Sequence, residues 1–169
     1  MSTKICAWNV RGLNDPSRLR EVAKFLKEDI NIVGLLETKV IDSNHVRILN
    51  HVLHDWVSLS NYEHAILGRS WVCWNPVFCT INVLDSSDQH MWCKIKVLNG
   101  DIHFFACFVY ALSTYGLRRP LFNKLEVLAQ LYRDFPCILL GDFNAIRFPY
   151  EKFGGDHSWA SCKNEFNLF

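Results

Sequence analysis

The sequence predicts an α/β fold in a single domain, and three observations support this prediction. Two amphipathic segments with helical spacing lie near residues 16–29 and 117–132. Apolar runs of strand length lie before, between and after them, and the dipeptide Asn99-Gly100 between two such runs is typical of a β-hairpin. The chain has 169 residues, 50% of them hydrophobic, which is enough for one domain with a substantial core.

The first third of the chain is predicted to form a strand, a helix and a second strand. Residues 4–10 have the composition of a strand. Asp15 and Pro16 are suited to the N-cap and the first position of the helix, which we expect to end near residue 29. The next apolar run, residues 32–36, is too short for a helix and is expected to be a buried strand that ends in Glu37.

Residues 41–55 give mixed signals, and strands dominate from residue 56 onwards. The predicted strands lie at about 56–60, 71–74, 77–84, 91–97 and 102–110. The second helix is followed by Pro136 and by a strand at residues 137–140. The last twelve residues carry an apolar helical face that is not complete at Phe169, and we therefore expect a chain that is cut short.

Charge and cysteine content exclude several classes of protein. The 18 Lys and Arg against 17 Asp and Glu give a net charge of +1, so any contact with a polyanion must come from a local patch. The seven cysteines have no zinc-site spacing and are expected to be reduced core residues of an intracellular protein, nuclear or cytoplasmic. No segment has the composition of a secretion signal or the length of a membrane span.

Polar side chains end four of the predicted strands. They are Asn9, Glu37, Tyr110 and the pair Asp142 and Asn144. Sites in α/β sheets assemble at strand ends, where rigid strands meet open loops. Each of these residues, taken alone, also suits a helix cap, a turn or the core. Their combination is what predicts a site.

This set of side chains favours phosphoryl chemistry at a hard cation. Glu37 is the candidate metal ligand, with the other coordination positions left to water and a phosphate oxygen. Asp142 is suited to orienting or deprotonating a water that attacks phosphorus. The neutral amides of Asn9 and Asn144 can bind phosphate oxygens without repelling them, and the Tyr110 hydroxyl can donate a hydrogen bond to the same group.

Four ordered motifs resemble the endonuclease/exonuclease/phosphatase superfamily. They are AWNVRGLN at 7–14, GLLETK at 34–39, VYA at 109–111 and LGDFNA at 140–145. More narrowly, the chain resembles the AP-endonuclease-like domain of plant LINE-type (non-LTR) retrotransposons. The cues for this group are WNVRGLNDPSR, LLETKV, GRSWVCWNP, the pair Arg118-Arg119 and EKFGG. The resemblance covers essentially the whole chain.

The resemblance implies a four-layer α/β sandwich of the DNase I type, with two facing mixed sheets between helices, incomplete at the C-terminus. It also implies a phosphodiesterase that depends on Mg²⁺, or on Mn²⁺, and nicks DNA to leave a 3′ hydroxyl. Glu37 would then bind the metal. The implied catalytic residues are Asn9, Tyr110, Asp142 and Asn144. A monomer is the default expectation.

The chain departs from this pattern at its C-terminal end. The family carries a further metal-site aspartate and a Ser-Asp-His motif, and the sequence stops before either. His157 follows Asn144 too closely to match that motif, and His103 lies within a strand, so we interpret both as non-catalytic. An inert truncated relic therefore remains an alternative. So does a nucleic-acid-binding module, with candidate contacts at Arg11, Lys39, Arg118 and Arg119. Hydrolysis of inositol phosphates, sphingolipids or RNA remains open within the superfamily.

Overall fold

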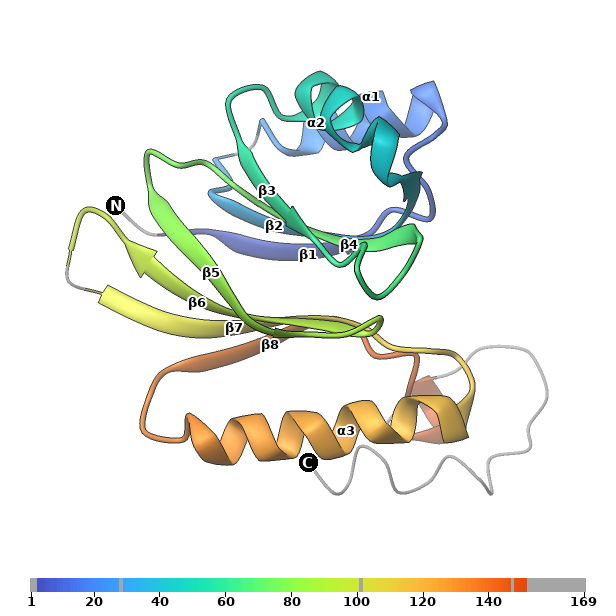
Figure 1. The fold of residues 1–169 in the computed structure, drawn as a ribbon, viewed down its shortest axis with the longest axis vertical. Helices are drawn as coiled ribbons and strands as arrows, with labels where there is room; N and C mark the ends of the chain where they lie inside the picture. Colours follow the sequence, from blue (N-terminus) through green and yellow to red (C-terminus); the bar gives the residue numbers. More distant parts are fainter. Residues whose placement is uncertain (1–2, 28, 101, 147, 152–169) are drawn as a thin grey trace.

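Two four-stranded sheets face each other between two layers of helices (Figure 1). The computed structural model describes residues 3–27, 29–100, 102–146 and 148–151. Helices α1 and α2 cover the outer face of the first sheet, and α3 covers the outer face of the second. This arrangement confirms the expected four-layer α/β sandwich. The predicted C-terminal helix and His157 lie outside the described residues.

The first sheet has the strand order β1-β2-β4-β3. Its strands are β1 (Ile5–Asn9), β2 (Ile32–Ile41), β3 (Val57–Ser60) and β4 (Leu67–Trp74). Strands β1 and β2 are parallel and are joined through α1 (Pro16–Phe25). The Asp15 carboxylate accepts a hydrogen bond from the Ser17 amide at 2.7 Å, as expected for an N-cap. The helix ends at Phe25, earlier than predicted.

The second sheet has the order β5-β6-β7-β8. Its strands are β5 (Cys79–Ser86), β6 (His90–Val97), β7 (Ile102–Tyr110) and β8 (Cys137–Asp142). Strands β5, β6 and β7 pair antiparallel, whereas β8 is parallel to β7. A parallel pair needs a long crossover, which α3 (Tyr115–Leu131) supplies. Two short 3-10 turns complete the fold, η1 (Asp42–Asn44) and η2 (Pro149–Glu151).

Helix α2 (His45–Val52) lies within residues 41–55, whose pattern indicates neither a helix nor a strand clearly. It is only eight residues long and no side chain caps its N-terminus. Its buried residues Ile48 and Leu49 pack against the first sheet, and the His45 ring lies 4.3 Å from the Trp71 ring. Short helices depend on such tertiary packing rather than on local signals, which explains why the sequence did not predict this helix.

Strand β2 is also longer than predicted. Its pairing with β4 shifts register between Leu36 and Val40, and Glu37 and Lys39 within this shift have φ angles of 56° and 55°. Such a β-bulge breaks the regular alternation of side chains. The predicted strand therefore stops at residue 36, whereas the real strand continues beyond the bulge to Ile41.

The core has three parts, one in each space between layers. Representative buried residues are Val22, Leu35 and Trp71 between helices and first sheet, Ile32, Val72 and Phe108 between the sheets, and Trp92, Phe105 and Leu125 under α3. Cys73, Cys79, Cys93 and Cys107 are buried and free, as expected, while Cys137 is exposed. Across the residues that the model describes, no helix is both long enough and apolar enough to cross a membrane.

Gly34 allows the two sheets to approach each other closely. A Cβ atom at this position would lie 2.2 Å from Cδ1 of the buried Phe108. We expect Gly34→Ala to lower the free energy of unfolding by about 1–3 kcal/mol, because the ring must move within a packed core. The matched control is Gly116→Ala in α3, where a Cβ atom would meet nothing within 4 Å.

Because alanine favours helix over glycine, Gly116→Ala should raise stability by up to about 1 kcal/mol. Urea denaturation of both variants measures the two changes. Equal stability of Gly34→Ala and the wild type would contradict the close approach of the sheets.

Candidate functional site

Four strands bring predicted site residues to one edge of the sandwich. Asn9 is the last residue of β1, and Tyr110 and Asp142 are the last residues of β7 and β8. Glu37 lies in the bulge of β2, directly after Leu36, which pairs with Asn9. The parallel directions of β1 with β2, and of β7 with β8, bring these ends together.

A hydrogen bond between Asn9 and Asp142 joins the two sheets at this edge. Nδ2 of Asn9 donates to Oδ2 of Asp142 at 2.8 Å, although the two residues are 133 positions apart in the sequence. Oδ1 of Asn9 accepts a hydrogen bond from the Arg11 amide at 3.1 Å. The Asn9 amide is therefore held from both ends, and it orients the Asp142 carboxylate.

The Glu37 carboxylate lies in the same cluster. Oε1 of Glu37 is 2.6 Å from the Lys39 ammonium, and Asn9 and Tyr110 also donate hydrogen bonds to this carboxylate. Burial raises the pKa of Glu37, but the hydrogen bonds from Lys39, Asn9 and Tyr110, together with the charge of Lys39, outweigh it and leave the pKa below its usual value. Glu37 is therefore ionised at neutral pH and only 19% exposed.

Tyr110 lies between the two carboxylates and a cation. Burial raises the pKa of its phenol, and the neighbouring charges of Glu37 and Asp142 raise it further, against an opposing effect of Arg69. The Arg69 guanidinium carbon lies 5.6 Å from the centre of the Tyr110 ring. The phenol therefore keeps its proton at neutral pH and acts as a hydrogen-bond donor. Sequence reasoning missed Arg69, although it belongs to the GRSWVCWNP motif.

Asn144 holds the loop that follows β8. It has a φ angle of 46°, its backbone amide donates to Oδ1 of Asp142 at 3.0 Å, and its Nδ2 donates to the Ala111 carbonyl at 2.7 Å. The left-handed backbone favours asparagine at this position. In this conformation the backbone amide of Asn144 positions Asp142, and its side-chain amide holds Ala111 at the end of β7. Contact between Asn144 and a phosphate stays a prediction.

Gln89 supports the same segment from the turn between β5 and β6, and sequence reasoning missed it. Its backbone carbonyl accepts from the Tyr110 amide at 2.8 Å, its Oε1 accepts from the Leu112 amide at 2.9 Å, and its Nε2 donates to the Leu117 carbonyl at 3.1 Å. Gln89 is 6% exposed. What marks Gln89 as a supporting residue is its burial within a turn. Because burial cannot be read from the sequence, no sequence signal could have identified this residue.

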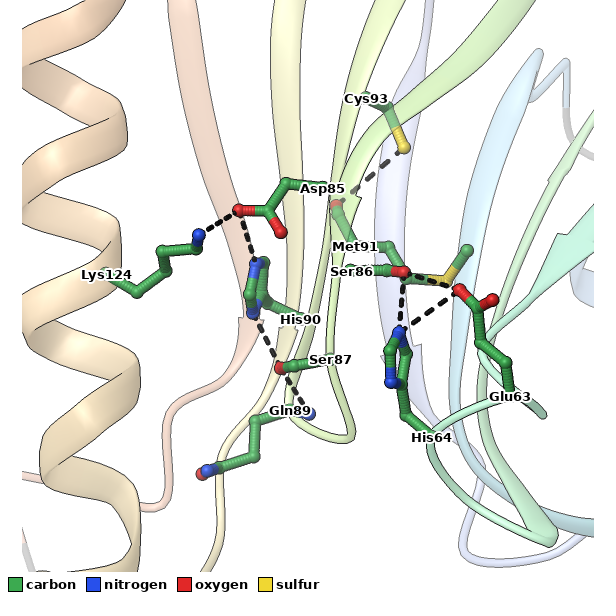
Figure 2. A network of polar contacts seen from close by, with 10 residues as sticks. All are labelled: Glu63, His64, Asp85, Ser86, Ser87, Gln89, His90, Met91, Cys93 and Lys124. Carbon is green, nitrogen blue, oxygen red and sulfur yellow. Dashed lines mark hydrogen bonds and ion pairs between the residues drawn. The ribbon is translucent and has the colours of Figure 1, made fainter.

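A network of polar contacts fixes this turn against α3, as Figure 2 shows. Lys124 of α3 lies 2.6 Å from Asp85, and the Ser87 hydroxyl is 2.8 Å from Nδ1 of His90 and accepts from the Gln89 amide at 3.0 Å. Burial lowers the pKa of His90, with smaller and opposing effects from nearby charges. His90 is therefore neutral at neutral pH, and the network stabilises the turn that carries Gln89.

The structure differs from the sequence prediction at Arg118. Its side chain is 3% exposed, and Nη1 donates to the Ser113 carbonyl at 2.8 Å. A side chain buried in this way holds the start of α3 and is not positioned to contact a phosphate backbone. Arg11, Lys39 and Arg119 are exposed, as that prediction requires. His103 is exposed at the far end of β7, where its ring lies 5.7 Å from that of Phe135.

The donor set is compatible with a hard divalent cation. The site offers the carboxylate oxygens of Glu37 and Asp142 as ligands, whereas Nδ2 of Asn9 and the Tyr110 hydroxyl face these carboxylates as hydrogen-bond donors. Across the described ranges, no group of three or more His, Cys, Asp or Glu residues is placed to hold a metal ion. Mg²⁺ commonly uses one or two carboxylates and keeps several waters, so two carboxylates fit this ion.

The comparison with protein families gives one match, which covers residues 6–162 and is described as the Endonuclease/Exonuclease/phosphatase family. The chain belongs to the endonuclease/exonuclease/phosphatase family. No curated protein matches this family member significantly in sequence.

Solved structures of other proteins share the fold of this family member. The endonuclease domain of TRAS1, a telomere-specific non-LTR retrotransposon, aligns with a TM-score of 0.65 and 10% identity over 92% of this chain and 65% of that one. A mannosyl-6-phosphatase from Bacteroides thetaiotaomicron aligns with a TM-score of 0.63 and 15% identity over 85% and 66%.

A third structure is TDP2 from D. rerio in complex with a single-strand DNA product, with a TM-score of 0.56 and 14% identity over 85% of this chain and 61% of that one. This family member therefore spans 61 to 66% of the length of the three solved chains. At these identities the likeness establishes the fold alone.

Proposed function

We propose that this chain is a divalent-cation-dependent phosphodiesterase domain of the retrotransposon type, which nicks DNA and leaves a 3′ hydroxyl. The observation that carries the proposal is the Asn9–Asp142 hydrogen bond, because it brings together Glu37 and Asp142 from opposite sheets. Two carboxylates with neutral donors between them form the arrangement that a hydrated cation and a phosphodiester require.

Each side chain has a distinct task in this proposal. Glu37 would hold Mg²⁺, or Mn²⁺, and the bound ion would polarise the phosphoryl group and neutralise its developing charge. Asp142, oriented by Asn9 and by the Asn144 amide, accepts a proton from the attacking water. Tyr110 keeps its proton and donates a hydrogen bond to a phosphate oxygen.

The choice of DNA as substrate rests on two supports. Lys39 and Arg69 place positive charge beside the carboxylates and Tyr110, which attracts a phosphate backbone. Proteins of the same fold include a retrotransposon endonuclease domain and TDP2 bound to a DNA product. The mannosyl-6-phosphatase has the same fold as well, so the substrate needs a direct test.

The test is a nicking assay on supercoiled plasmid with purified protein. We expect conversion to the open circle in Mg²⁺ or Mn²⁺ and none in EDTA, and the nicked product should prime DNA polymerase without phosphatase treatment, because it ends in a 3′ hydroxyl. Mannose 6-phosphate and an inositol phosphate serve as competing substrates. Duplex binding without nicking would overturn the proposal in favour of a binding module. If the protein neither binds nor nicks DNA, the result would overturn the proposal in favour of an inert relic.

A further inference from the structure

The Lys39 ammonium occupies the position beside Glu37 that a cation would take. Nζ of Lys39 lies 2.6 Å from Oε1 of Glu37, a distance typical of a charge-assisted hydrogen bond. Mg²⁺ binds carboxylate oxygens at about 2.0–2.1 Å, so an ion on the same oxygen atom would meet the ammonium directly. Bound to the other oxygen, the ion would still lie within a few ångströms of a like charge.

The backbone imposes this arrangement. Glu37 and Lys39 both have left-handed φ angles within the β-bulge, and the buried Thr38 between them donates its hydroxyl to the Gly68 carbonyl. The Leu13 amide donates to the Thr38 carbonyl at 2.8 Å, and Nδ2 of Asn14 donates to the Lys39 carbonyl at 2.7 Å. The segment is therefore anchored on both sides, and the two charged side chains are brought together by the fold.

The lysine side chain itself is free to leave. Lys39 is 55% exposed, against 19% for Glu37. A Cβ atom added to Gly12 would lie 3.8 Å from Cδ of Lys39, so the lysine stem runs past a residue without a side chain. The ammonium can therefore swing into solvent at small steric cost, while the glutamate stays in place.

We infer that Lys39 is a built-in, exchangeable counter-ion of Glu37, which a divalent cation must displace in order to bind. This inference rests on the proposed function, because it assumes the cation site at Glu37. Displacement lowers the affinity of the site for cations. It also releases an ammonium group beside the site only once the cation is bound, so that the free lysine and the metal become available to a phosphate together.

The test measures cation binding without any substrate. Free Mn²⁺ is followed by its electron paramagnetic resonance signal during titration of the wild type and of Lys39→Gln, Lys39→Arg and Glu37→Gln. Removal of the ammonium in Lys39→Gln should tighten binding by about three- to fivefold, the upper range for a partly exposed ion pair. Lys39→Arg keeps the charge and can pair with the carboxylate through two hydrogen bonds, so its Mn²⁺ affinity should be equal to or lower than that of the wild type.

The matched control is Lys4→Gln. Lys4 is also 55% exposed and also pairs with an acid, Asp29, at 3.1 Å, but it lies away from the site at the opposite end of β1. This variant removes the same charge and should leave Mn²⁺ affinity unchanged within about twofold, since exposed charges at this distance are largely screened. A similar gain in both glutamine variants would show a general charge effect and would overturn the inference.

A second measurement follows the lysine directly. Acetylation by a water-soluble ester, read by mass spectrometry, should be faster at Lys39 relative to Lys4 when Mn²⁺ is present. Equal cation affinity of the wild type and Lys39→Gln, with binding lost in Glu37→Gln, would overturn the inference alone. Absence of Mn²⁺ binding in every variant would overturn the cation site of the proposed function as well.

Discussion

Replacement of Asp142 by asparagine is expected to reduce the rate of plasmid nicking by about 100- to 10,000-fold, the range observed when a general base is lost. The amide keeps the shape of the carboxylate but cannot accept a proton from water. It also turns an N–H toward one of the two groups that now donate to Asp142, the Asn9 amide or the Asn144 backbone amide. We therefore expect a cost in stability of only about 1 kcal/mol.

The control for this prediction is Asp134→Asn, which removes the same charge from an exposed acid that lies 3.9 Å from Arg133. Nicking rates under single-turnover conditions and urea midpoints are measured for both variants. Asp142→Asn should lose nicking activity and keep the fold. Asp134→Asn should change neither the nicking rate nor the urea midpoint. Nicking by Asp142→Asn at the wild-type rate would exclude this carboxylate from the chemistry.

Gly141→Ala should have the largest effect on stability. Gly141 has a φ angle of 143°, and a Cβ atom there would lie 2.0 Å from the Val109 carbonyl oxygen, its partner in the β7–β8 ladder. The obstacle is backbone, so the strands themselves must separate. Strain and overpacking together should cost about 2–5 kcal/mol.

The damage from Gly141→Ala should be concentrated at the site. Ala111 donates its amide to the Asp142 carbonyl at 2.9 Å, so a displaced β8 moves Asp142 away from Asn9. Hydrogen exchange should show lost protection between β7 and β8 but retained protection between β5 and β6. Gly100→Ala is the control, because its Cβ atom would be 3.6 Å from the Ile102 side chain, an ordinary contact. Equal protection in both variants would contradict the prediction.

The residues that meet at this edge could be predicted from the sequence because polar residues end apolar runs in a characteristic order. Asn9, Glu37, Tyr110 and Asp142 were all predicted at strand ends, and all four meet at one edge of the sandwich. Local patterning suffices here, since strand ends are marked by the change from apolar to polar residues. The metal and the catalytic roles of these residues stay predictions.

Other features of the site depend on contacts between distant segments. Arg118 looked like a surface cation but is buried at the start of α3, whereas Arg69 and Gln89 contact the Tyr110 region from separate hairpins. The bulge that pairs Lys39 with Glu37 is likewise held by Leu13 and Gly68. Neither the burial of Arg118 nor these contacts between distant segments can be predicted from one short stretch of the sequence.

Sequence patterns were sufficient to predict the fold class, most strand positions, two of the helices and the residue types gathered at this edge, because hydrophobic periodicity and strand-end polarity are local properties. Three features could be seen only in the folded chain: α2 is a helix, β2 continues past a bulge, and Asn9 donates a hydrogen bond to Asp142. Those features depend on packing and hydrogen bonds between segments up to 133 positions apart, and such pairings form only when the two sheets face each other.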